Sequence, residues 1–140
     1  MGDFAYVVTE SGELHKVDSR TMRARWIYKG SAAVATPPAY SSSRGILIYA
    51  TDDLYVSAVN ETDGKELWHV KPTPNPAGFP NEFDGQYPVI AEQHGLVFLR
   101  MRLDHDKGLW GGPGKGGMYP NTNAETRTFL VDNPDRKSVV

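Results

Sequence analysis

The chain has 140 residues, of which 39% are hydrophobic and 23% charged, and its formal net charge at pH 7 is −2. This is the composition of an ordinary globular protein, and the small net charge gives no reason to expect nucleic acid or an anionic membrane as a partner. No apolar run approaches the roughly 20 residues of a membrane helix, and we expect no signal peptide in this chain. Because there is no cysteine, disulfides, thiolate zinc sites and cysteine nucleophiles are excluded.

Short strands joined by tight turns are predicted throughout, because the chain has 14 glycines and 10 prolines and no capped helical period. In chain order, we predict strands over residues 4–8, 14–18, 23–28, 33–40, 46–50, 54–59, 65–70, 87–91, 95–99 and 126–132, with another beginning at 137–140. Pro37 and Pro38 place the fourth strand at a sheet margin, because proline cannot donate to a strand ladder. The proline-rich residues 72–80 are predicted to form a stiff, extended connector.

Residues 4–26 and 46–68 follow the same pattern at a constant offset of 42 positions. Three pairs are identical across this offset, namely Thr9/Thr51, Val17/Val59 and Trp26/Trp68. A partial third copy begins at residues 87–99, which match residues 37–49 at an offset of 50. A period in this range predicts stacked structural repeats, none of which buries its hydrophobic face alone.

The architecture follows from three strands that are apolar at consecutive positions, residues 4–8, 46–50 and 96–99. Such strands are expected to be buried on both faces, whereas a two-layer sandwich buries one face per strand. We therefore predict an all-β fold, a β-propeller of four-stranded antiparallel sheets with two to three blades, which is a partial ring. The predicted boundaries are about 1–31 for the first blade, 32–72 for the second, 73–84 for a connector and 85–140 for the third, with an insertion at 103–125.

Two segments, residues 18–26 and 60–68, resemble the quinoprotein-like (PQQ-like) β-propeller repeat. That repeat ends as Ala-x-Asp-x-x-Thr-Gly-x-x-x-Trp, a pattern called the tryptophan docking motif. The second copy matches it at Ala58, Asn60, Gly64 and Trp68, and the first copy matches it at Asp18, Thr21 and Trp26. The first copy departs from the motif with Lys16 in place of alanine and Met22 in place of glycine, and Asn60 replaces the aspartate of the second copy.

A structural role is predicted for the residues of the motif. Asp18 and Asn60 can accept hydrogen bonds from the amides of their own turns, and Gly64 tolerates the positive φ that such a turn requires. The indoles of Trp26 and Trp68 are expected to lie flat against the next sheet, each with its N–H bonded to a carbonyl. Sheets that are not closed into a full ring leave exposed edges, through which the chain can associate.

Three further features of the C-terminal half are candidates for sites. Asp104 and Asp106 have the alternating spacing of calcium ligands, but the twelve-residue loop is not completed, so a solvated loop is predicted and no metal site. The glycine-rich run 111–117 lacks the Ser or Thr and the helix of a phosphate-binding loop. The insertion as a whole is a candidate ligand or partner loop, through Trp110, Lys115, Met118 and Tyr119.

The leading functional hypothesis is a non-catalytic binding or scaffold module with no evident cofactor, whose partners are the remaining propeller blades or another protein. The resemblance implies an alternative, a fragment of a quinoprotein dehydrogenase that oxidises alcohols or sugars with pyrroloquinoline quinone and calcium. Eight-bladed members of that class typically carry adjacent cysteines, which are absent here. A second alternative is a propeller resembling the lipoprotein that assists outer-membrane barrel assembly. The resemblance favours a periplasmic or other extracytoplasmic compartment.

Overall fold

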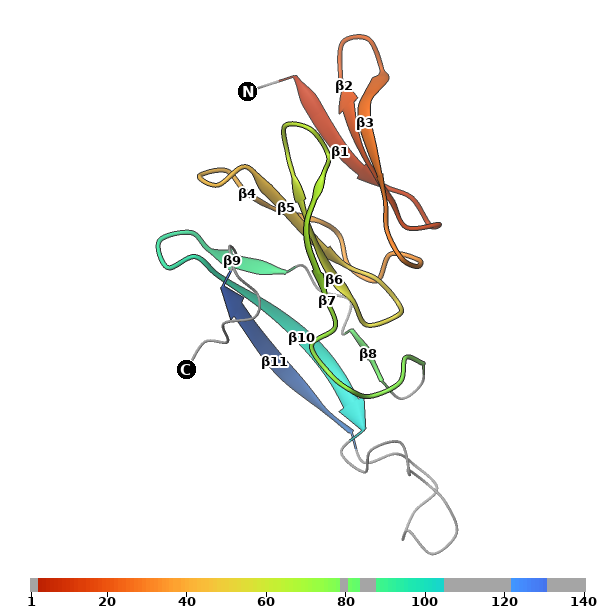
Figure 1. Ribbon diagram of the computed structural model, residues 1–140, viewed down its shortest axis with the longest axis vertical. Helices are drawn as coiled ribbons and strands as arrows, with labels where there is room; N and C mark the ends of the chain where they lie inside the picture. Colours follow the sequence, from red (N-terminus) through yellow and green to blue (C-terminus); the bar gives the residue numbers. More distant parts are fainter. Residues whose placement is uncertain (1–2, 79–80, 84–87, 105–121, 131–140) are drawn as a thin grey trace, which may run out of the picture.

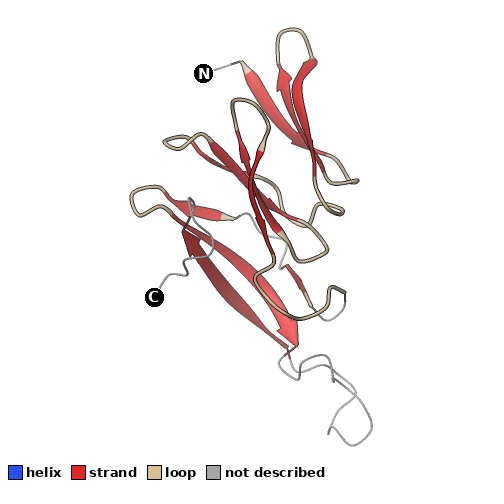
Figure 2. Cartoon of the chain, viewed as in Figure 1, coloured by secondary structure: helices blue, strands red, loops and turns tan. Residues whose placement is uncertain are grey.

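The computed structural model describes residues 3–78, 81–83, 88–104 and 122–130, and every regular element in these ranges is a strand (Figure 2). Three antiparallel sheets follow one another along the molecule in chain order (Figure 1). The strands are β1 (Phe4–Val8), β2 (Glu13–Asp18), β3 (Arg23–Lys29), β4 (Ala39–Ser41), β5 (Ile46–Ala50), β6 (Val56–Asn60), β7 (Glu66–Val70), β8 (Glu82–Phe83), β9 (Val89–Ala91), β10 (Leu96–Asp104) and β11 (Thr122–Leu130).

The sheets differ in how many strands they contain. The first sheet has the order β1-β2-β3, and the second has the order β4-β5-β6-β7. In the third sheet β10 pairs with β11 on one side, while β8 and β9 pair with its two ends on the other side. The prediction of antiparallel propeller-type sheets is therefore confirmed, with one sheet of three strands and two of four.

The predicted strands in the first two sheets agree with the structure apart from their ends. The fourth strand was predicted too long: only Ala39–Ser41 is a strand, because Pro37 and Pro38 have no N–H for the ladder, and Val34 forms an isolated bridge with Thr51. The strand predicted over residues 54–59 begins at Val56, because Leu54 has a φ of 70° and belongs to the preceding turn.

The proline-rich segment after β7, predicted to be stiff and extended, is bent at residues 72, 74, 75 and 77, and Gly78 forms a bridge with Asn81. Asn81, which is almost completely buried, holds the bend with its side chain: Nδ2 donates to the Pro76 carbonyl at 3.0 Å, and Oδ1 accepts from Asn75 Nδ2 at 3.0 Å. The residues that follow form β8, which pairs with β10 and so belongs to the third sheet. Side-chain amides that cap local carbonyls compensate for the donors that proline lacks.

The predicted insertion at residues 103–125 is shorter in the structure, because strands take up both of its ends. β10 continues to Asp104 and β11 begins at Thr122, and these two residues are paired. The predicted strand over residues 126–132 accordingly begins four positions earlier than expected. Of the candidate residues in the insertion, Asp104 is the last residue of β10, while Asp106, Trp110, Lys115, Met118 and Tyr119 lie outside the described residues. The strand predicted to begin at 137–140 lies outside them too.

The middle sheet is buried on both faces, as predicted. Ile46, Ile48 and Ala50 of β5 pack into a core shared with the third sheet, and Leu47 and Tyr49 of the same strand pack into a core shared with the first sheet. The same expectation was wrong for β1, where Ala5 and Val7 are exposed, and for β10, where burial alternates. The reason is positional, because the described residues place a second sheet against only one face of each outer sheet.

Candidate functional site: the contacts between neighbouring sheets

The two turns that precede β3 and β7 are built alike from the motif residues. Asp18 Oδ1 accepts a hydrogen bond from the backbone N–H of Arg20 at 2.9 Å, and Asn60 Oδ1 accepts one from the N–H of Thr62 at 2.8 Å. The bond from the Arg20 amide is the main reason why the pKa of the Asp18 carboxyl lies below its ordinary value. In both turns a further bond closes back onto the Asp18 or Asn60 carbonyl, at 2.7 and 2.8 Å respectively.

The residue that closes each turn has a left-handed backbone. Gly64 has a φ of 73°, as its place in the motif predicts, and Met22 has a φ of 60° in the first copy. Met22 therefore adopts a conformation that costs an L-residue about 1–2 kcal/mol, and its side chain is 76% exposed, so no packing offsets that cost. The departure from the motif is tolerated at the expense of local strain.

Trp26 lies against the second sheet. Its Nε1–H donates to the Glu61 carbonyl at 2.9 Å, and the indole packs with the core shared by the first two sheets. A Cβ added at Gly64 would lie 2.5 Å from Trp26 Cδ2, so the ring rests directly on the glycine backbone. Gly64 thus serves two purposes: it closes its own turn, and it leaves room for the tryptophan of the neighbouring sheet.

The carboxylate of Glu61 joins the first two sheets beside Trp26. It lies 2.7 Å from Lys16 Nζ and accepts a hydrogen bond from the Tyr6 hydroxyl. These bonds, from Lys16 first and Tyr6 second, hold the pKa of Glu61 below its ordinary value, while burial and the neighbouring Glu61 raise the pKa of Tyr6. Lys16 also lies 4.3 Å above the Phe4 ring. A lysine where the motif has alanine is therefore accommodated by an ion pair across the interface.

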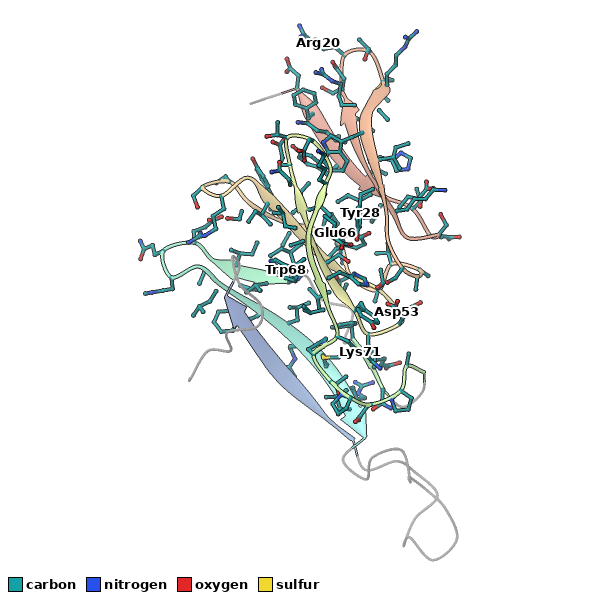
Figure 3. The ribbon with its side chains drawn as sticks, viewed as in Figure 1. Arg20, Tyr28, Asp53, Glu66, Trp68 and Lys71 are labelled. Carbon is teal, nitrogen blue, oxygen red and sulfur yellow. The ribbon has the colours of Figure 1, made fainter. Side chains whose placement is uncertain are left out.

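The contact between the second and third sheets uses different residues. Trp68 packs against the apolar core that Ile46 and its neighbours share with β10 (Figure 3). Glu92, in the turn before β10, accepts hydrogen bonds from the hydroxyls of Ser41 at 2.8 Å and Ser43 at 2.6 Å. Those two bonds, with the Ser43 bond the larger cause, lower the pKa of Glu92. Arg44 completes the contact by donating to the Glu92 carbonyl at 2.9 Å.

A polar cluster at the first interface was not predicted from the sequence. The Tyr28 hydroxyl donates to Glu66 Oε1 at 2.6 Å, and Tyr28 and Glu66 approach each other from different sheets (Figure 3). Burial first, and the bond to Glu66 second, raise the pKa of Tyr28 to about 12. On the same side of the second sheet, Ser57 Oγ lies 2.8 Å from His69 Nδ1, and the His69 ring stacks on Tyr55. No sequence motif marks these residues, because Ser57 and Glu66 are 29 and 38 positions from Tyr28 in the chain.

The described part of the chain has neither a cluster of metal-ligating side chains nor a membrane-spanning helix. No group of three or more His, Asp or Glu side chains there is arranged to hold a metal ion. None of the described segments is a helix long and apolar enough to cross a membrane. The described residues form contacts between sheets, made by aromatic rings and by Glu61, Glu66 and Glu92 with their partners from the neighbouring sheet.

The comparisons with known proteins agree with this architecture. The family model described as outer membrane protein assembly factor BamB, a PQQ-like repeat family, matches residues 1–98. The chain belongs to this family. A search of curated proteins finds no significant match.

Solved structures of PQQ-type propellers share the fold of this family member. BamB from Moraxella catarrhalis is 18% identical, with a TM-score of 0.54 over 72% of this chain and 30% of its own. A europium-containing methanol dehydrogenase is 17% identical, with a TM-score of 0.65 over 96% of this chain and 22% of its own. The quinohemoprotein alcohol dehydrogenase from Comamonas testosteroni is 17% identical, with a TM-score of 0.67 over 94% of this chain and 18% of its own. The chain thus spans less than a third of the length of these proteins.

Proposed function

We propose that this chain acts as a non-catalytic binding or scaffold module within a PQQ-like repeat propeller. The observation that carries the proposal is the match of residues 1–98 to a family described as an outer membrane protein assembly factor. An assembly factor acts by binding other proteins, and it needs a rigid surface more than a reactive centre. On this proposal the partners are further propeller blades or other proteins, and the compartment is extracytoplasmic.

The chemistry of the interfaces supports the proposal. The carboxylates of Glu61 and Glu92 both carry depressed pKa values, which in other proteins can mark catalytic groups. Here each is bonded to donors of the adjacent sheet, Glu61 to Lys16 and Tyr6, and Glu92 to a run of serines. The depressed pKa values of Glu61 and Glu92 are therefore explained by contacts that stabilise the stacking of the sheets.

A quinoprotein dehydrogenase fragment is the second candidate. It is favoured by the structural likeness to the two dehydrogenases, which extends over 94–96% of the chain and so includes strands beyond the family match. The described residues contain no group of side chains suited to a metal ion, so they do not themselves fit a calcium-held quinone. On this candidate, residues outside the described part would have to hold both groups.

Quinone binding and turnover distinguish the two candidates. The purified full-length protein is incubated with pyrroloquinoline quinone and calcium, separated from free quinone by gel filtration, and assayed for dye-linked oxidation of primary alcohols. We expect no retained quinone absorbance and no oxidation above the protein-free rate. Oxidation that depends on both quinone and protein would overturn the scaffold proposal.

A second experiment tests binding directly. A photo-reactive amino acid replaces Tyr40, which lies on β4 with 46% of its surface exposed, in the full-length protein inside cells. We expect one predominant protein adduct, and we expect its purified partner to form a complex with the purified full-length protein. If no adduct forms, or if the purified proteins do not associate, a binding role for this surface is wrong.

A further inference from the structure

The covalent link between the first two sheets and the motif turns lie at opposite ends of the first interface. Neighbouring strands are antiparallel, so the turns after β2 and β6 share one end, while residues 30–38 lead from β3 to β4 at the other (Figure 1). We call these the turn end and the link end. Because the chain crosses from the first sheet to the second at the link end, the turn end is held closed by non-covalent contacts.

One residue at the turn end of the second sheet bonds to all three strands of the first. The Glu61 carboxylate accepts from the hydroxyl of Tyr6 on β1 and lies 2.7 Å from Nζ of Lys16 on β2. The Glu61 carbonyl accepts from Lys16 Nζ at 3.3 Å and from Nε1 of Trp26 on β3 at 2.9 Å. The closure of the turn end therefore depends on Glu61.

Lys16 makes this contact depend on charge. The residue is only 8% exposed, and besides Glu61 its ammonium faces the Phe4 ring, 4.3 Å from the ring centroid. Removing one partner of a buried ion pair leaves an uncompensated buried charge, which is strongly destabilising. A protonated Glu61 can still accept a hydrogen bond, but it no longer neutralises Lys16. Opening the turn end would then return the ammonium to water.

The other charged side chains near the turn end do not replace Glu61. Arg25 and Asp18, whose Nη1 and Oδ2 are 3.9 Å apart, pair with each other within the first sheet. Glu66 accepts a bond from Tyr28 across the interface, but it is exposed, and its neutral carboxyl can still accept from that hydroxyl. Protonation of Glu66 therefore leaves no charge buried, whereas protonation of Glu61 does.

The link end is held by contacts that carry no charge. The Gly12 carbonyl accepts from the Gly30 N–H at 3.0 Å and from the hydroxyl of Tyr49, which is completely buried, at 3.0 Å. A Cβ added at Gly12 would lie 1.9 Å from the Ala32 carbonyl oxygen, so the turn of the first sheet rests directly on the link. Burial raises the pKa of Tyr49, so this phenol keeps its proton in neutral and acidic solution.

The titratable side chains nearer the link end do not pair one sheet with the other. Each has its partner in its own sheet or turn: Glu13 with His15, Asp53 with Thr51, and His69 with Ser57. Asp53 bonds in addition to Ser31, which belongs to the link. A change in their protonation therefore leaves the bonds to the Gly12 carbonyl in place.

We infer that protonation of Glu61 releases the turn end of the first sheet from the second while the link end stays closed, which makes the first interface an acid-sensitive hinge. The carboxylate, whose pKa is lowered by Lys16 first and Tyr6 second, stabilises the closed form above the open-state pKa of about 4.3. This contribution is lost as the pH falls through the closed-form pKa, so the release belongs below about pH 4. The inference does not depend on the proposed scaffold role.

Pairs of spin labels test whether one end opens before the other. In the full-length protein, with any cysteine outside these 140 residues replaced by serine, Thr21→Cys and Thr62→Cys label the turn end, and Ser11→Cys and Asp52→Cys label the link end. All four side chains are exposed. Double electron–electron resonance gives the distance distribution of each pair between pH 7 and pH 3. We expect the turn-end distribution to broaden and shift to longer distances below about pH 4, and the link-end distribution to stay unchanged.

Two variants distinguish the buried ammonium from acid unfolding in general. Glu61→Gln imitates the protonated carboxyl, so its turn end should be open already at pH 7. The double variant Lys16→Met/Glu61→Gln has no ammonium to hydrate, and a buried ion pair can be replaced by uncharged side chains of similar volume at little cost. Its turn end should stay closed down to pH 3, and this result is informative even if the single variant does not fold.

The inference is wrong if both pairs of labels separate at the same pH, which is global unfolding, or if the turn-end distances at pH 7 and pH 3 are the same. It is equally wrong if the double variant opens in acid as the wild type does. The scaffold proposal is tested separately by quinone-dependent turnover, and neither result decides the other.

Discussion

Replacing Gly64 by alanine is expected to destabilise the chain through two separable effects. The residue has a φ of 73°, a conformation that costs alanine about 1–2 kcal/mol. In addition, the new Cβ would lie 2.5 Å from Trp26 Cδ2 and within 2.7 Å of two further ring atoms, so the indole must move. Overpacking of this kind typically costs about 1–3 kcal/mol, which gives a total of about 2–5 kcal/mol in the free energy of unfolding.

Gly45 provides the matched control. Its φ of 64° is nearly the same, but an added Cβ would meet nothing within 4 Å, so Gly45→Ala should cost only the backbone term of about 1–2 kcal/mol. In a Trp26→Ala background the clash is absent, and Gly64→Ala should then cost no more than Gly45→Ala. Urea unfolding followed by circular dichroism gives the free energies of wild type, the two glycine variants, Trp26→Ala and the Trp26→Ala/Gly64→Ala double variant. Equal costs for Gly64→Ala and Gly45→Ala in the wild-type background would refute the argument that Trp26 rests on this glycine.

Three further predictions concern residues of the first interface and its turn. Met22→Gly should raise the free energy of unfolding by about 1 kcal/mol, because it removes the strain at a φ of 60° from an exposed side chain; a lower urea midpoint would contradict this. Glu61 has a depressed pKa, so its contribution is present above the unfolded-state pKa of about 4.3 and is lost as the pH falls through its folded-state pKa. The difference in the free energy of unfolding between wild type and Glu61→Gln should therefore shrink from pH 7 to pH 3. If this difference stays constant, the ion pair between Glu61 and Lys16 does not cause it. Tyr28 has a pKa raised to about 12, so its contribution is present below the unfolded-state pKa of about 10 and is lost as the pH rises toward 12. Tyr28→Phe should accordingly lose less stability than wild type between pH 9 and pH 12, and parallel curves would contradict a raised pKa of Tyr28.

Local chemistry explains why much of the fold could be predicted from the sequence. The turn geometry of Asp18 and Asn60 depends on residues two to four positions away, and the burial of residues 46–50 on both faces follows from an uninterrupted apolar run. The expected packing of Trp26 against the next sheet rested on the repeat alone, and the structure places its N–H on the Glu61 carbonyl.

Tertiary structure decided what depends on the neighbouring sheet. The partner of Lys16 is 45 positions away in the chain, and nothing in the local pattern selects Glu61 among the 17 acidic residues. Distant segments also decide two features of the third sheet. β8 pairs with β10, and β10 and β11 pair with each other beyond their predicted ends. Repeats and turns are encoded over a few residues, whereas an ion pair or an added strand requires two distant segments to be brought together by the stacking of the sheets.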